Sequence, residues 1–279
     1  MIESFIIALR EGIEAALIVG IILGYLKKVG AESQTRPVYY GVGFGIAASV
    51  AVAALFVLLS VEFEGRFEQV FEGATMFLAA AILTTMILWM HQNSKAYSDD
   101  LKRRVDSAID KTKTYGLATL AFVSIFREGI ETVLFLGSAS FTSTGIQIII
   151  GGALGLALAV VIGLAIMRYS VRLNLKTFFN ATGVLLILFA AGLVAHGIHE
   201  FEEAGWFNPL VGDVYDVGWL VSGDSALGKL MSALFGYDSS PSMAQILGYL
   251  GYWALIVFWV YQDTTMHALE RAVAAIRPA

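Results

Sequence analysis

The sequence Arg10-Glu11-Gly12-Ile13-Glu14 lies inside an apolar run near the start of the chain. The same five residues recur as Arg127-Glu128-Gly129-Ile130-Glu131, 117 residues later and again inside an apolar run. Insertion of a charged group at the centre of a membrane helix costs roughly 2.5–3.5 kcal/mol. A chain that keeps six such groups in two matching places is expected to use them, and the repetition predicts two related halves.

The composition around these motifs indicates a membrane protein. The 279 residues are 57% hydrophobic and 15% charged, whereas soluble domains have about 25% charged residues. Apolar runs long enough to cross a hydrocarbon core of about 30 Å recur along the chain, and they are continuous, without the alternation of a β-barrel strand. We therefore predict an all-α, polytopic membrane protein. Its seven expected transmembrane helices cover residues 2–26, 38–60, 70–91, 116–140, 145–167, 178–200 and 244–262.

Further similarities extend the repeat beyond the charged motif. The glycine-rich stretch 41–45 matches 151–155, and Phe71-Glu72-Gly73-Ala74-Thr75 resembles Phe179-Asn180-Ala181-Thr182. Each repeat has three helices, and because three is odd, the second must enter the membrane from the opposite side. We expect a 3+3 inverted repeat plus one extra helix, as in many secondary transporters. The expected units are 1–115, 116–203, and 204–279, the last containing an outer loop, the seventh helix and a tail.

The distribution of lysine and arginine predicts the orientation. Fourteen of the 18 basic residues lie in the connections after the first, third and fifth helices and in the C-terminal tail. By the positive-inside rule the N-terminus is outside and the C-terminus cytoplasmic, in the cytoplasmic membrane. The first apolar run lacks a basic leader, so we expect a retained helix. The opposite connections are acidic, which suits either a solvated loop or a vestibule that attracts cations.

The motif spacing suggests a cation site. Glutamates three residues apart share one helix face, and an arginine reaches a glutamate at i,i+4. Glycine allows a second helix to approach closely. Crossing the first and fourth helices would gather four carboxylates, which are hard ligands suited to hard cations. Self-neutralising ion pairs that join helices are the alternative, but the second glutamate of each motif argues against it. The predicted metal ligands are Glu11, Glu14, Glu128 and Glu131, with Arg10 and Arg127 as supporting ion pairs.

A second polar cluster ends the sixth predicted helix. Its histidines are three residues apart, as are two of its glutamates, and this spacing suits either an outer entry site for metal or an ordinary solvated helix end. The candidate entry residues are Glu72, His196, His199, Glu200 and Glu203. Methionines could offer soft ligands for copper, but the spacing of Met76, Met86, Met90, Met231 and Met243 favours ordinary packing.

Several activities are excluded or disfavoured. The chain has no cysteine, so disulfides and thiolate sites are excluded. It lacks a P-loop, so nucleotide hydrolysis is not expected, and nothing in its charge suggests nucleic-acid binding. Three functions stay open from the residues alone: a metal-ion permease, an intramembrane di-metal enzyme, and a proton-coupled carrier of an organic solute.

Two Arg-Glu-Gly-Ile-Glu motifs in a seven-helix chain of this length resemble the high-affinity iron permeases that work beside an oxidase. The resemblance covers the whole chain and implies that the four motif glutamates bind and pass iron, taken up as ferric ion. It implies a transporter and not an enzyme, with iron as cargo and no prosthetic group. It also implies an extracytoplasmic oxidase or iron-delivery protein as partner, and lead or another multivalent metal as an alternative substrate.

Overall fold

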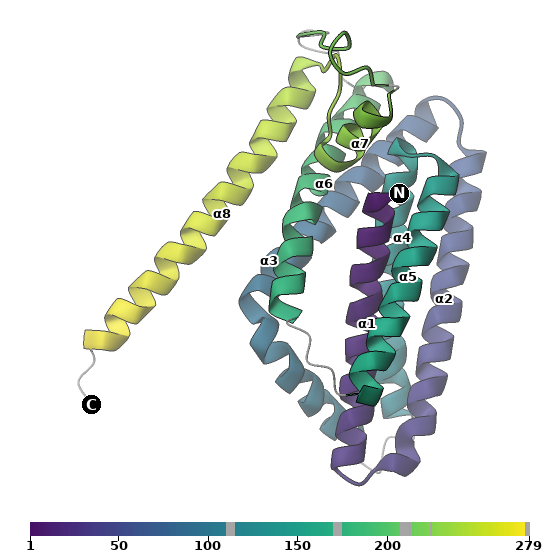
Figure 1. Cartoon of the computed structure of the whole chain (residues 1–279), viewed down its shortest axis with the longest axis vertical. Coiled ribbons are helices and arrows are strands. Elements are labelled where there is room, and N and C mark those ends of the chain that lie inside the picture. Colours follow the sequence, from purple (N-terminus) through teal and green to yellow (C-terminus); the bar gives the residue numbers. More distant parts are fainter. Residues whose placement is uncertain (110–114, 170–174, 207–211, 213, 224, 277–279) are drawn as a thin grey trace.

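The computed structural model describes residues 1–109, 115–169, 175–206, 212, 214–223 and 225–276. Their regular structure is helical, and no strand occurs among them. The helices are α1 (Ile2–Lys28), the short 3-10 helix η1 (Glu32–Gln34), α2 (Thr35–Glu62), α3 (Arg66–Ile109), α4 (Gly116–Thr142), α5 (Gly145–Tyr169), α6 (Leu175–Glu203), α7 (Ala226–Phe235) and α8 (Met243–Ile276). Figure 1 shows α1 to α6 gathered in one bundle, from which α8 leans away.

The predicted apolar segments all fall within long helices. A helix satisfies its own backbone hydrogen bonds, which is why apolar runs adopt it in lipid. Stretches of α2, α3, α5, α6 and α8 are long and apolar enough to cross a membrane. Helices α1 and α4 are of similar length, but each carries the charged motif in its apolar run. The chain is a polytopic all-α membrane protein, and the count of seven spans stays a prediction.

Two helical regions were expected to be connections. Helix α3 continues to Ile109, well past the predicted span 70–91 and into the connection that follows it, because Leu101 and Val105 pack against Ile18 and Leu117 in a second apolar core. Helix α7 forms within the predicted outer loop, where Ser225 accepts a hydrogen bond from the Gly228 N–H as its N-cap. Only the second region was unexpected as a helix, because its Gly/Ser-rich composition is typical of a loop.

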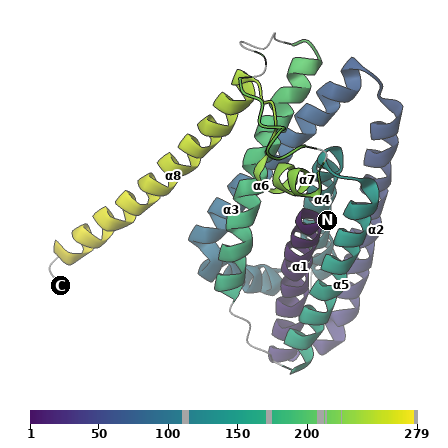
Figure 2. The same ribbon diagram turned by 45° about the horizontal axis from the view of Figure 1, so that its top comes forward.

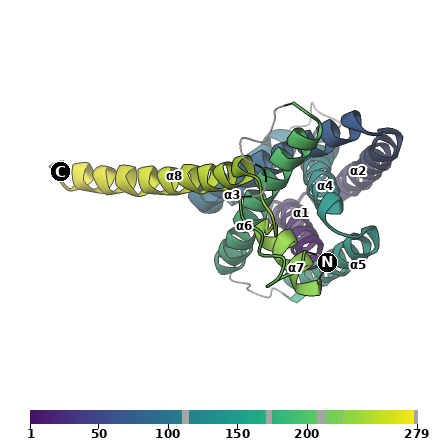
Figure 3. The same ribbon diagram turned by 90° about the horizontal axis from the view of Figure 1, so that it is seen from above.

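The bundle has the packing that an inverted repeat requires. Figure 1 shows α1 and α4 running in opposite directions. The most extensive helix pairs are α1 with α5, α2 with α4, and α3 with α6. In the inverted repeat, α1, α2 and α3 correspond to α4, α5 and α6. The pair α1 with α5 then corresponds to the pair α4 with α2, and the pair α3 with α6 corresponds to itself. Figure 3 shows α1 and α4 in the middle of the bundle, with α3 and α6 on one side and α2 and α5 on the other.

Glycine contacts show the same symmetry at the level of residues. A Cβ atom on Gly12 of α1 would lie 2.6 Å from the Ala159 Cβ of α5. A Cβ atom on Gly129 of α4 would collide with Ser49 of α2. Gly129 follows Gly12 by 117 residues, which is the spacing of the two charged motifs. Ala159 follows Ser49 by 110 residues, which is the spacing of the glycine-rich stretches 41–45 and 151–155. The motif glycines therefore bring each motif helix against its partner from the other half.

The two remaining helices lie at the periphery. Figure 2 shows α7 lying across the end of the bundle near the N-terminus. Helix α8 meets α6 near its first turns, and its Tyr252 hydroxyl lies 2.8 Å from Thr84 Oγ1 of α3. The remainder of its described surface is largely exposed and apolar, as expected for a helix that faces lipid.

Candidate metal centre

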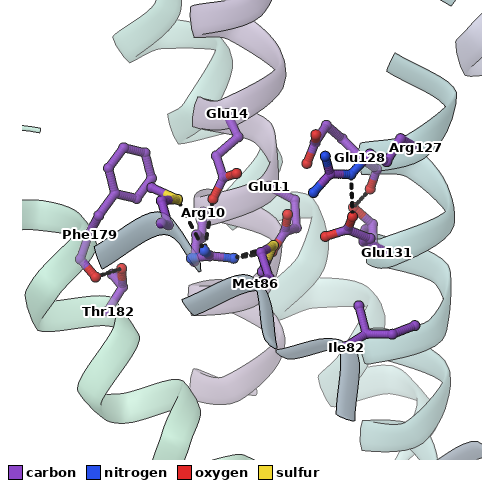
Figure 4. Close-up of polar contacts among 12 residues, drawn as sticks. Arg10, Glu11, Glu14, Ile82, Met86, Arg127, Glu128, Glu131, Phe179 and Thr182 are labelled. Atoms are coloured by element: carbon purple, nitrogen blue, oxygen red, sulfur yellow. Dashed lines mark hydrogen bonds and ion pairs between the residues drawn. The ribbon is translucent and has the colours of Figure 1, made fainter. Parts of the chain in front are cut away.

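Glutamates from both motifs meet where α1 and α4 pack together (Figure 4). Glu11, Glu128 and Glu131 each offer a carboxylate oxygen, and these three atoms lie within 4.8 Å of one another. The residues are 1%, 4% and 7% exposed. We call these three residues the glutamate triad. Its geometry and oxygen donors could hold a metal ion.

Each residue of the triad has one buried oxygen without a hydrogen-bond partner among the described residues. These atoms are Oε2 of Glu11, Oε2 of Glu128 and Oε2 of Glu131. Buried polar atoms are nearly always paired, because leaving one unpaired costs about 1–3 kcal/mol. One such atom on each member of the triad indicates a place where a cation or protons are needed.

Arg10 holds the motif of α1 together. Its Nη1 lies 2.8 Å from Glu11 Oε1, and its Nη2 lies 3.0 Å from Glu14 Oε1. The same guanidinium contacts two methionines of α3, with Nη1 3.3 Å from Met86 Sδ and Nη2 3.6 Å from Met90 Sδ. Sequence reasoning predicted the pairing with Glu14 but assigned both methionines to packing, since no motif connects them to Arg10.

The second motif differs from the first despite its identical sequence. Arg127 donates from Nε to Glu131 Oε1 at 2.7 Å, but its side chain is 52% exposed, whereas that of Arg10 is 1% exposed. Glu14, the counterpart of Glu131, is 14% exposed at its side chain and stays beside Arg10 outside the triad. The structure thus brings three of the four predicted ligands within ligand distance of one another, with the fourth alongside.

The predicted outer residues lie where α3 and α6 cross, and their role as an entry site stays a prediction. Helices α3 and α6 cross closely where Gly73 faces Gly197, and Glu200 packs against Gly73. Glu200 there interacts electrostatically with Glu68, Glu72 and Glu203, and His199 Nε2 lies 3.2 Å from Glu203. Glu68 was not among the candidates from sequence.

His196 makes different contacts. Its Nδ1 lies 2.9 Å from the Gly192 carbonyl oxygen and its Nε2 lies 3.1 Å from Ser232 Oγ of α7. Both ring nitrogens are therefore engaged, Nδ1 within α6 and Nε2 with Ser232 of α7. The partner of Nε2 comes from α7, a helix that the sequence pattern did not predict.

Comparison with known proteins identifies the family. A model of the iron permease FTR1 family matches residues 1–274. The chain belongs to this family. The permease is 34% identical over 282 residues to a protein of Yersinia pestis named ferrous iron permease EfeU, with all of both chains covered. It is 36% identical over 248 residues to the EfeU of Escherichia coli O6:K15:H31, covering 88% of this chain and 90% of the relative.

A third relative has no function in its name. An uncharacterised protein of Archaeoglobus fulgidus is 36% identical over 274 residues, covering 94% of the permease and 95% of that relative. No solved structure matches the permease. The resemblance drawn from the two motifs is confirmed for the family, and iron transport is supported by the names of its relatives.

Proposed function

We propose that this permease moves ferrous iron inward across the cytoplasmic membrane through the glutamate triad, with Glu14 completing the pathway. The observation that carries the proposal is the unpaired, buried carboxylate oxygen on each of Glu11, Glu128 and Glu131. Iron is cargo in this proposal, not a resident cofactor. The oxidase or delivery protein implied by the resemblance stays a prediction.

The charge balance of the centre favours a divalent ion. Four motif carboxylates and two guanidinium groups leave two formal negative charges. A ferrous ion neutralises them, and uncompensated charge in a low-dielectric interior is costly. The relatives named ferrous iron permease support the same oxidation state. The ferric ion expected from the resemblance is therefore an alternative for the experiment below.

The surroundings of the triad support a pathway that is closed toward the acidic end of the bundle. Ile7 lies about one turn before Glu11 and Phe135 about one turn after Glu131, on antiparallel helices, so both lie toward the acidic end of the bundle. Both are fully buried in an apolar core that also includes Met76 and Leu193. This core separates the triad from the acidic ends of α3 and α6. We infer that inward transport requires the helices that form this apolar core to move apart.

Glu11→Gln is expected to lower the initial rate of iron uptake at least about tenfold, because it removes a charged ligand while keeping the side-chain volume. The measurement is uptake of radioactive iron into vesicles that contain the purified permease. Ferrous iron kept reduced by ascorbate is compared with ferric citrate, and lead is added as a competitor.

Glu3→Gln is the matched control. Glu3 lies on the same helix, is 2% exposed and also has a buried Oε2 without a hydrogen-bond partner among the described residues, but it lies outside the triad, at the helix end, where Oε1 accepts a hydrogen bond from Ser143. We expect this variant to transport iron like the wild type. Wild-type uptake by Glu11→Gln would refute the triad, and faster uptake of ferric than of ferrous iron would refute the proposed oxidation state.

A further inference from the structure

We infer that Met86 is a specificity-determining ligand, whose thioether makes the centre prefer softer transition-metal ions to Mn²⁺, Mg²⁺ and Ca²⁺. This inference rests on the proposed function, since it adds a ligand to the glutamate triad. Met86 is 6% exposed and lies on α3, outside both charged motifs.

The position of the sulfur carries the inference. Met86 Sδ and Glu11 Oε1 contact the same atom, Arg10 Nη1, at 3.3 and 2.8 Å. The guanidinium thus occupies a place between a thioether and a triad carboxylate. A metal ion entering the triad repels Arg10, because both are cations, and withdrawal of Nη1 leaves the sulfur and the Glu11 carboxylate facing the same space. Figure 4 shows Met86 reaching Arg10 beside Glu11.

Packing and pairing requirements do not explain a methionine here. Thioether sulfur is a weak hydrogen-bond acceptor, yet the fully buried Arg10 uses two of them while its Nε has no partner among the described residues. The pairing of Ala74-Thr75 with Ala181-Thr182 places Leu193 at the position of Met86 in the other half. Leu193 is 1% exposed in the same apolar core, so an aliphatic residue suits the corresponding position of α6.

The chemistry of the donors predicts what the sulfur adds. Carboxylate oxygens alone suit Mg²⁺, Ca²⁺ and Mn²⁺, whereas thioethers favour softer ions. A site of three carboxylates discriminates poorly between ferrous iron and these more abundant hard ions. One thioether beside the carboxylates provides that discrimination without adding charge.

The test compares Met86→Leu with the wild type by titrating purified permease with Cd²⁺, as a soft probe, and with Mn²⁺, as a hard one. We expect the ratio of the two affinities to fall about tenfold in Met86→Leu through weaker Cd²⁺ binding. Met76→Leu is the matched control, because Met76 lies on the same helix and is 1% exposed in the apolar core. It should leave the ratio unchanged.

Each outcome has a separate meaning. Equal weakening of both metals in Met86→Leu, or an unchanged ratio, overturns the thioether ligand while leaving the triad intact. Absence of metal binding by the wild type overturns the proposed function and this inference together. X-ray absorption at the cadmium edge of the wild type tests the inference even if Met86→Leu does not fold. We expect a cadmium–sulfur distance in its spectrum, and oxygen neighbours alone would refute it.

Discussion

Arg10→Gln is expected to destabilise the permease by about 3–5 kcal/mol, because removing one partner of a buried ion pair leaves the other charge unpaired. The Arg10 side chain is 1% exposed and lies 2.8 Å from Glu11 and 3.0 Å from Glu14. Without the guanidinium, these carboxylates and the triad would repel one another inside the bundle. The measurement is the free energy of unfolding in mixed micelles, followed by loss of helical circular dichroism.

The same change in the other motif provides the control. Arg127 occupies the identical sequence position but its side chain is 52% exposed, so less of its ion pair is buried within the bundle. Arg127→Gln is expected to cost less than Arg10→Gln, because it leaves less unpaired charge inside the bundle. Equal losses in the two variants would contradict the asymmetry of the two halves. In the double variant Arg10→Gln/Glu11→Gln we expect partial recovery, because the unpaired carboxylate nearest to Nη1 is also removed.

Gly155→Ala is expected to have the second largest effect, a loss of about 3 kcal/mol, at the upper end of overpacking costs. A Cβ atom on Gly155 of α5 would meet the backbone of α1, namely the Phe5 carbonyl oxygen and, at 2.9 Å, the Leu9 nitrogen. Backbone atoms cannot rotate away, so α1 must shift. Since Arg10 directly follows Leu9, we also expect slower iron uptake by the folded fraction of this variant.

Two glycines of α2 provide comparison variants for Gly155→Ala. A Cβ atom on Gly45, the counterpart of Gly155, would lie 3.1 Å from Ile125 Cβ and 3.2 Å from the Phe122 carbonyl oxygen, farther than the closest contacts at Gly155, so Gly45→Ala should cost less. A Cβ atom on Gly43 would meet no other helix of the described chain within 4 Å, and Gly43→Ala is expected to be neutral or stabilising by up to about 1 kcal/mol. The free energies of unfolding of all three variants are compared in the same micelles. A loss in Gly43→Ala as large as in Gly155→Ala would show that helix spacing is not the cause.

Much of the architecture could be predicted from the sequence because lipid imposes simple rules. Apolar runs must form helices to satisfy their backbone, and this determined the positions of α1 to α6 and of the first part of α8. Two copies of one charged motif, three helices apart, determined the inverted repeat. Because buried charges need partners, the motifs also predicted that their four glutamates would converge, and three of them lie together, namely Glu11, Glu128 and Glu131.

The tertiary structure decided what two identical motifs could not. Arg10 is buried between Glu11 and Met86 while Arg127 is half-exposed, because exposure depends on which helices cover each motif. His196 binds Ser232 because α7 folds over α6, and this contact joins residues 36 positions apart. Local sequence specifies helices and their charged faces, since these depend on neighbours within a turn or two. The contacts of each face depend on helix packing across the whole bundle, which no single segment encodes.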